Sequence, residues 1–133
     1  SVQGTAEGVK AAVKEKAKEE LKKVEEEVRE EASQKAEEIL AEAEARAEKI
    51  MAEARKTGDQ LVKEAEKQGE KLVEEANNPL KKIAAREAAK ELVRQAEQKS
   101  TELLQEAEKQ SDKLLEEARK KARDSRIIMP GVQ

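Results

Sequence analysis

Hydrophobic residues recur along most of this chain with a period of eleven residues. In each repeat a small residue comes first, two aliphatic residues occupy the fourth and fifth positions, and an alanine occupies the eighth. Such a period corresponds to about 3.67 residues per turn, slightly above the natural value for an α-helix, and favours a right-handed supercoil. We therefore predict an all-α protein in which the aliphatic pairs form the helix–helix interface. The pairs are Ile39-Leu40, Ile50-Met51, Leu61-Val62, Leu72-Val73, Leu92-Val93, Leu103-Leu104 and Leu114-Leu115.

The repeat changes phase beside three consecutive residues, Asn77, Asn78 and Pro79. Proline inside a helix costs about 3 kcal/mol, whereas at the first position of a new helix it is favourable. Asparagine before it suits the N-cap of that helix, and another asparagine tolerates the conformation that ends the preceding one. The triplet predicts a turn, and the chain a long antiparallel helical hairpin with eleven-residue repeats. A kinked continuous helix is the alternative that the sequence leaves open.

The pattern predicts five segments. An N-terminal helical extension covers 1–31, the first hairpin arm 32–76, the turn 77–79, the second arm 80–124, and a non-helical apolar tail 125–133. In the N-terminal extension the apolar residues follow each other singly, three or four positions apart. We expect the tail to pack on this extension, with Ile127 and Ile128 near Val24 and Val28.

Residues that lie level with each other in the two arms of a hairpin have numbers with a constant sum. We predict a sum of 154, because this value places aliphatic pairs opposite aliphatic pairs. Leu61-Val62 then faces Leu92-Val93, and Ile50-Met51 faces Leu103-Leu104. The same register sets small residues opposite each other, as in Gly58 with Ala96, Gly69 with Ala85, Ala47 with Ala107 and Ala43 with Ser111.

The composition points to a partner chain. Charged residues make up 44% of the sequence and aromatic residues are absent, so a thick globular core is excluded. An isolated two-helix hairpin would bury each aliphatic stripe incompletely. We therefore expect a homo-oligomer, with a dimer of hairpins favoured, and an additional protein partner that the sequence does not identify.

Candidate chemistry is sparse. The chain has no His and no Cys, and its 28 basic and 31 acidic residues are interleaved, which is typical of solvated helix faces. We predict no enzyme, no catalytic residue, no cofactor and no metal site. No basic block or aromatic residue suits nucleic acid, and no apolar run is long enough for a transmembrane segment. Gly58 and Gly69 are interpreted as close-contact positions in the repeat rather than as hinges or ligand sites.

Three stretches resemble known families. Residues 32–56, ASQKAEEILAEAEARAEKIMAEARK, resemble the right-handed coiled-coil stalk subunits of rotary ATPases. Residues 5–20, TAEGVKAAVKEKAKEE, are similar to late-embryogenesis-abundant desiccation proteins, and residues 77–93, NNPLKKIAAREAAKELV, to helical tails of AsmA-type bacterial envelope proteins. The last resemblance favours an exported or envelope-associated location over a cytoplasmic one.

Together these observations predict a non-catalytic structural or scaffolding coiled-coil protein that self-associates. Two alternatives stay open. The first is a client-holding chaperone or stress protectant. The second is an amphipathic protein that binds lipid surfaces, which usually carries aromatic residues and a wider apolar face.

Overall fold

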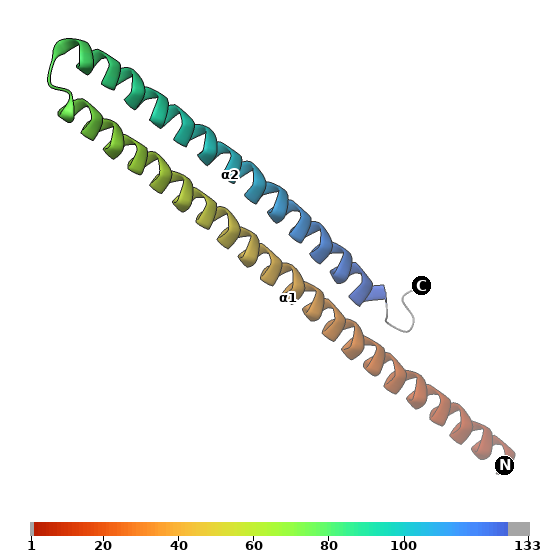
Figure 1. The fold of residues 1–133 in the computed structure, drawn as a ribbon. Helices are drawn as coiled ribbons and strands as arrows, with labels where there is room; N and C mark the ends of the chain where they lie inside the picture. Colours follow the sequence, from red (N-terminus) through yellow and green to blue (C-terminus); the bar gives the residue numbers. More distant parts are fainter. Residues whose placement is uncertain (1, 128–133) are drawn as a thin grey trace. The chain divides into compact units, whose positions relative to one another are not determined.

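The computed structural model describes residues 2–127, and the side chains of residues 5–127. It contains two helices, α1 (Val2–Glu75, 74 residues) and α2 (Pro79–Ile127, 49 residues), which pack against each other (Figure 1). No strand occurs in this part of the chain. The predicted fold class, an all-α helical hairpin, is confirmed.

The chain is divided into two compact units. We call Glu42–Glu116 the turn unit, and Ser1–Ala41 together with Glu117–Gln133 the terminal unit. Each unit contains a segment of α1 and a segment of α2. The turn unit includes the connection between the helices, whereas the terminal unit includes the N-terminal part of α1 and the end of α2.

The connection is short, and the asparagine and proline that precede and begin α2 explain its geometry. Asn78 caps α2: its Oδ1 accepts a hydrogen bond of 2.8 Å from the backbone N–H of Lys81, and its carbonyl oxygen accepts one of 3.0 Å from the N–H of Lys82. Pro79 is the first residue of α2, where its missing N–H costs nothing. The prediction of a cap followed by a helix start is confirmed, and the kinked continuous helix is wrong.

Residues of the predicted N-terminal extension and first arm lie in one uninterrupted helix. Two predicted boundaries need correction. The first arm ends at Glu75, so the residues outside helices are 76–78 rather than 77–79. The predicted non-helical tail begins too early, since α2 continues to Ile127. Pro130 is the first residue there that cannot continue a helix, and it lies outside the described residues.

The predicted register is also wrong, by one helical turn. In the turn unit Gly58 lies against Ser100, Gly69 lies against Ala89, and the Ser111 hydroxyl donates a hydrogen bond of 3.3 Å to the carbonyl oxygen of Ala47. The two numbers of each pair add up to 158 rather than 154. The helices are therefore displaced by about four residues from the predicted alignment.

Side-chain volume explains this displacement. A sum of 154 would set aliphatic pairs opposite each other and force the helices apart. With a sum of 158, small residues face small residues, and the second member of an aliphatic pair lies level with an alanine of the other helix. In this register Met51 is level with Ala107, and Val93 with Ala65. Since the separation of packed helices depends on the side chains at the contact, this arrangement permits a close approach.

For the described residues of the tail, the predicted packing on the N-terminal extension is not found. Val24 is exposed, and Ile127 has 67% of its surface exposed. Ile128 lies outside the described residues. Within the terminal unit, Ala36 and Ala122 are buried and also have numbers that add up to 158. In this register Ile127 is level with Glu31, beyond the reach of Val24.

Candidate functional site

Small residues form the seam between the helices. In the turn unit the seam consists of residues whose side chains are buried or absent, and it has no large side chain that is fully buried. The serine in it satisfies its hydroxyl through the hydrogen bond to the opposite helix. The buried residues of this seam are Ala43, Ala47, Gly58, Ala65, Gly69, Ala107 and Ser111.

The two glycines lie where the helices approach most closely, as predicted. A Cβ atom added to Gly69 would lie 2.8 Å from the Cβ and 3.3 Å from the Cα of Ala89. A Cβ atom added to Gly58 would lie 3.1 Å from the Cβ of Ser100 and closer still to its Oγ. A methyl group at Gly69 would require the backbone of the opposite helix to move, whereas one at Gly58 would require the Ser100 hydroxyl to rotate away and its Cβ to shift slightly. The interpretation of both glycines as close-contact positions is confirmed.

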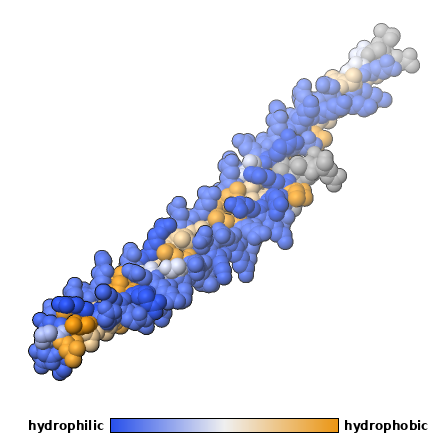
Figure 2. All heavy atoms as spheres, turned by 90° about the horizontal axis from the view of Figure 1, so that it is seen from above, coloured by the Kyte–Doolittle hydropathy of each residue, from blue (hydrophilic) through white to orange (hydrophobic). Residues whose placement is uncertain are grey.

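The predicted interface residues flank this seam rather than fill it. Thirteen of the fourteen aliphatic residues are half-buried, and Leu72 is 39% exposed. Hydrophobic side chains therefore reach the surface between charged ones (Figure 2). The half-buried residues are Ile39, Leu40, Ile50, Met51, Leu61, Val62, Val73, Leu92, Val93, Leu103, Leu104, Leu114 and Leu115.

Grooves in the turn unit separate the first members of the aliphatic pairs from the second members. One groove contains the first members Ile50 and Leu103. Two others contain only second members, Met51 with Leu115 and Val73 with Val93. First and second members therefore line different grooves.

The groove next to the turn is the candidate site with the clearest chemistry. It has a volume of about 720 Å³, and Gly69, Val73, Ala89 and Val93 are its apolar residues. The charged residues around it are separated by sign. On α1 they are Glu66, Glu70 and Glu74, and on α2 they are Arg86, Lys90 and Arg94, followed by Glu97 farther from the turn.

These rims were not singled out in the sequence. The sequence does contain a signal for these rims, because the residues of each rim recur at intervals of four and so lie on one side of their helix. What the sequence did not give is the pairing of an acidic set on one helix with a basic set on the other around one groove. That pairing depends on the register of the hairpin.

Another apolar surface lies on the N-terminal part of α1, in the terminal unit. Its large residues lie three, four or eight positions apart, and all are exposed, Val13 by 62%. Between residues 5 and 31 only Glu25 is half-buried. This stripe consists of Val9, Val13, Leu21, Val24 and Val28.

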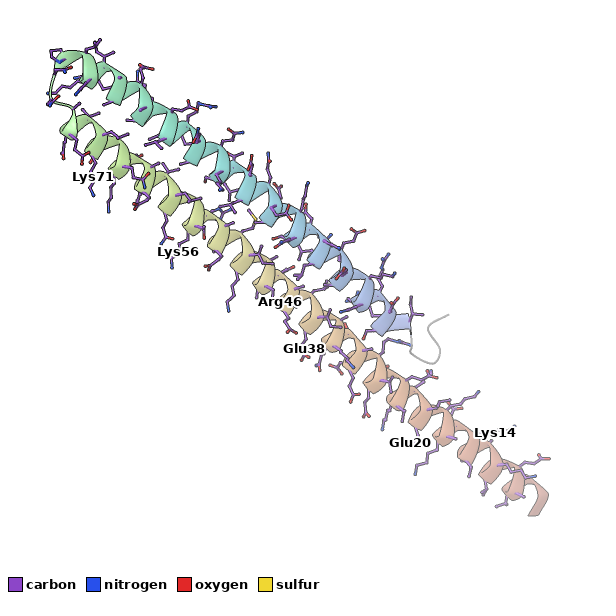
Figure 3. The ribbon with its side chains drawn as sticks, in the orientation of Figure 1. Lys14, Glu20, Glu38, Arg46, Lys56 and Lys71 are labelled. Atoms are coloured by element: carbon purple, nitrogen blue, oxygen red, sulfur yellow. The ribbon has the colours of Figure 1, made fainter. Side chains whose placement is uncertain are left out.

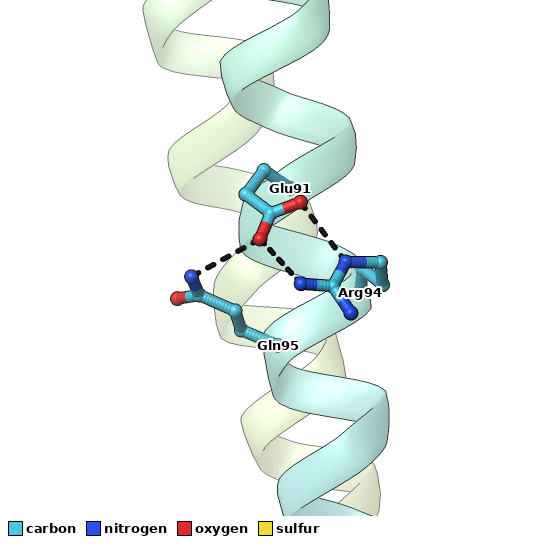
Figure 4. A network of polar contacts seen from close by, with 3 residues as sticks. All are labelled: Glu91, Arg94 and Gln95. Atoms are coloured by element: carbon cyan, nitrogen blue, oxygen red, sulfur yellow. Dashed lines mark hydrogen bonds and ion pairs between the residues drawn. The ribbon is translucent and has the colours of Figure 1, made fainter.

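The remaining charged side chains lie on the solvent-facing sides of the helices. Lys56 and Lys71, for example, point away from α2 (Figure 3). Glu91 forms the most extensive ion pair of the described residues. Its carboxylate accepts hydrogen bonds of 2.9 Å from Arg94 Nε and 2.6 Å from Arg94 Nη2, and one of 3.3 Å from Gln95 Nε2 (Figure 4). The hydrogen bonds from Arg94 lower the pKa of Glu91 below its usual 4.5, and the same pair raises the pKa of Arg94.

Among the described residues, no cluster of three or more carboxylate, His or Cys side chains could hold a metal ion. Within residues 2–127 neither helix contains a stretch long and apolar enough to cross a membrane. The grooves of the turn unit combine apolar residues with charged residues at their edges.

No family model, no curated protein and no solved structure matches this chain. The resemblances of residues 5–20, 32–56 and 77–93 to known families therefore stay predictions.

Proposed function

We propose that this protein is a non-catalytic, self-associating helical hairpin that acts as a spacer or scaffold. The single observation that carries the proposal is that small and large residues have different roles in the hairpin. The small residues hold the two helices together, and the aliphatic pairs that flank them stay only half-buried within one chain. Large aliphatic side chains gain about 1.5–3 kcal/mol each when fully buried, so the flanks favour contact with further helices.

The exposed aliphatic residues at the start of α2 support the same proposal. Leu80 is 78% exposed, and Ile83 is also exposed. Together with Leu72 they place three large aliphatic residues at the surface near the turn. A second hairpin would cover surface of this kind, as in a four-helix arrangement.

Sedimentation equilibrium of the full chain tests the proposal. We expect a mass that rises with concentration from 14.8 kDa towards at least twice that value. A mass that stays at 14.8 kDa up to millimolar concentration would contradict self-association. A bacterial envelope is the proposed setting, on the strength of the resemblance of residues 77–93, and cell fractionation of the producing organism would test it.

The exposed stripe of the N-terminal part of α1 favours a second candidate, a client-holding chaperone. Its large aliphatic residues are exposed among the described residues of the terminal unit and are accessible to unfolded chains. A holdase would suppress the aggregation of a heat-denatured enzyme at stoichiometric ratios, with Val13→Ser and Leu21→Ser together abolishing the effect. A spacer would leave the aggregation unchanged. Flotation with lipid vesicles tests the lipid-binding alternative in the same way.

A further inference from the structure

We propose that the groove next to the turn binds the same groove of a second copy of this chain, with the two turns at the same end. The inference rests on the proposed self-association and specifies where and how it occurs. Its basis is the separation of charge around the groove, with acids on α1 and bases on α2.

Each rim places like charges next to one another along its own helix. Glu66, Glu70 and Glu74 follow each other at intervals of four residues, as do Arg86, Lys90 and Arg94. Like charges at this spacing on a helix repel each other. Among the described residues, the three glutamates and Arg86 form no ion pair. Lys90 pairs only with Glu87, and Arg94 only with Glu91, both on the same helix. A partner that brings opposite charges to each rim relieves this repulsion.

A second copy satisfies both rims at once if the two-fold axis runs along the helices. This symmetry places α1 of each copy over α2 of the other and keeps every residue at its own height. In the observed register Glu70 is level with Ala88, between Arg86 and Lys90. Glu66 is level with Leu92, between Lys90 and Arg94. The acids of one copy therefore lie between the bases of the other, on both sides of the interface.

The opposite arrangement is disfavoured by the same charges. If the turns lay at opposite ends, α1 of one copy would cover α1 of the other, and the glutamate rims would face each other. Complementary charges fix the orientation of partners in this way, since juxtaposed like charges are costly. The apolar residues between the rims are small or medium in size, namely Gly69, Val73, Ala89 and Val93. They allow the two hairpins to come close.

The complementarity is confined to the region near the turn. Farther along the same face, the groove beside Met51 and Leu115 has Glu44, Glu48 and Arg55 as its charged residues, all of them from α1. No basic residue of α2 lines that groove. We infer that the specific contact between the copies lies beside the turn.

Charge reversal tests the proposal. One variant carries Glu66→Lys and Glu70→Lys, and the other carries Arg86→Glu and Lys90→Glu. In each variant alone, the facing rims of two copies have the same sign, and we expect self-association to weaken by at least about tenfold. Mixed in equal amounts, the two variants present opposite rims to each other and should form a heterodimer. A chain with all four substitutions should regain the homodimer.

A matched control has the same change of net charge outside the groove. Glu64→Lys with Glu75→Lys alters two exposed glutamates of α1 that do not line it. We expect this control to self-associate like the parent chain in sedimentation experiments at low salt. Circular dichroism of every variant checks that the helices are retained.

The outcomes separate the two proposals. If the parent chain stays monomeric, the proposed function itself fails. If the parent chain associates but the groove variants associate equally well, or if the mixture of the two variants does not form a heterodimer, the assignment of the groove is overturned and self-association stands. Weakening in both variants with rescue in the mixture supports the assignment.

Discussion

Two regions of this molecule both carry large aliphatic residues along their helices but present different surfaces. In the turn unit, α1 and α2 bury a seam of alanine, glycine and serine, and the large aliphatic residues lie beside it. In residues 5–31 of α1, the apolar stripe consists of single large residues, and all of them are exposed. Within the terminal unit the described part of α2 ends level with Glu31, so the earlier stripe has no facing helix.

The comparison teaches that apolar content does not decide what is buried in this protein. The buried residues are mostly those with the smallest side chains, because they let two backbones approach and make many short contacts. The large residues of the N-terminal stripe contribute more apolar area per residue, yet they gain nothing from it within one chain. Substitutions that change residue size should therefore act strongly on the seam and weakly on the stripe.

The largest effect is expected from a large residue in the seam. Ala47→Leu places an isobutyl group against Ser111 and should lower the free energy of unfolding by about 1–3 kcal/mol, because overpacking forces the helices apart. The same substitution at exposed Ala11 is the control and should change it by no more than about 0.5 kcal/mol. Urea unfolding followed by circular dichroism measures both. Equal effects at the two positions would contradict the role of the seam.

Loss of the helix cap should have the next largest effect. Asn78→Ala removes the acceptor of the Lys81 N–H and should cost about 1 kcal/mol. Asn78→Ser is the matched control, since serine caps helices about as well as asparagine and should preserve the stability. If both substitutions leave the unfolding curve unchanged, the cap does not help to hold the hairpin together.

A smaller effect is expected from substituting one glycine in each region. In a helix, Gly→Ala is favourable by about 1 kcal/mol, and nothing lies near the added Cβ atom at Gly8. We expect Gly8→Ala to increase helicity, and Gly58→Ala to destabilise the hairpin through its clash with Ser100. Combining Gly58→Ala with Ser100→Gly should remove the clash. A double-mutant cycle without coupling between the two sites would show that they are not in contact.

The smallest effect concerns the exposed ion pair of α2. Arg94 lowers the pKa of Glu91 in the folded chain. The pair therefore contributes stability that is fully present above the pKa that Glu91 has in the unfolded chain. This contribution is lost as the pH falls through the lowered pKa of the folded chain, below its usual 4.5. Nuclear magnetic resonance titration should show the pKa of Glu91 rising towards 4.5 in an Arg94→Gln variant. An unchanged pKa would mean that the pair does not persist in solution.

Much of the fold was predictable from the sequence, because the relevant signals are local. The eleven-residue repeat gave the helices, and Asn78 with Pro79 gave the turn and its cap. The close-contact role of Gly58 and Gly69 followed from their place in the repeat. The candidate groove was not predictable, because its two rims come from separate helices whose alignment the repeat does not determine.

Local signals in the sequence specify that two helices form, where the chain reverses, and which positions of the repeat are small or large. Which residues face each other depends on how the two helices pack. Every register that differs by a whole repeat or by one turn brings apolar residues together, so periodicity cannot choose among them. Steric fit makes the choice, since Gly58 against Ser100 and Gly69 against Ala89 allow a close approach that opposed aliphatic pairs would prevent.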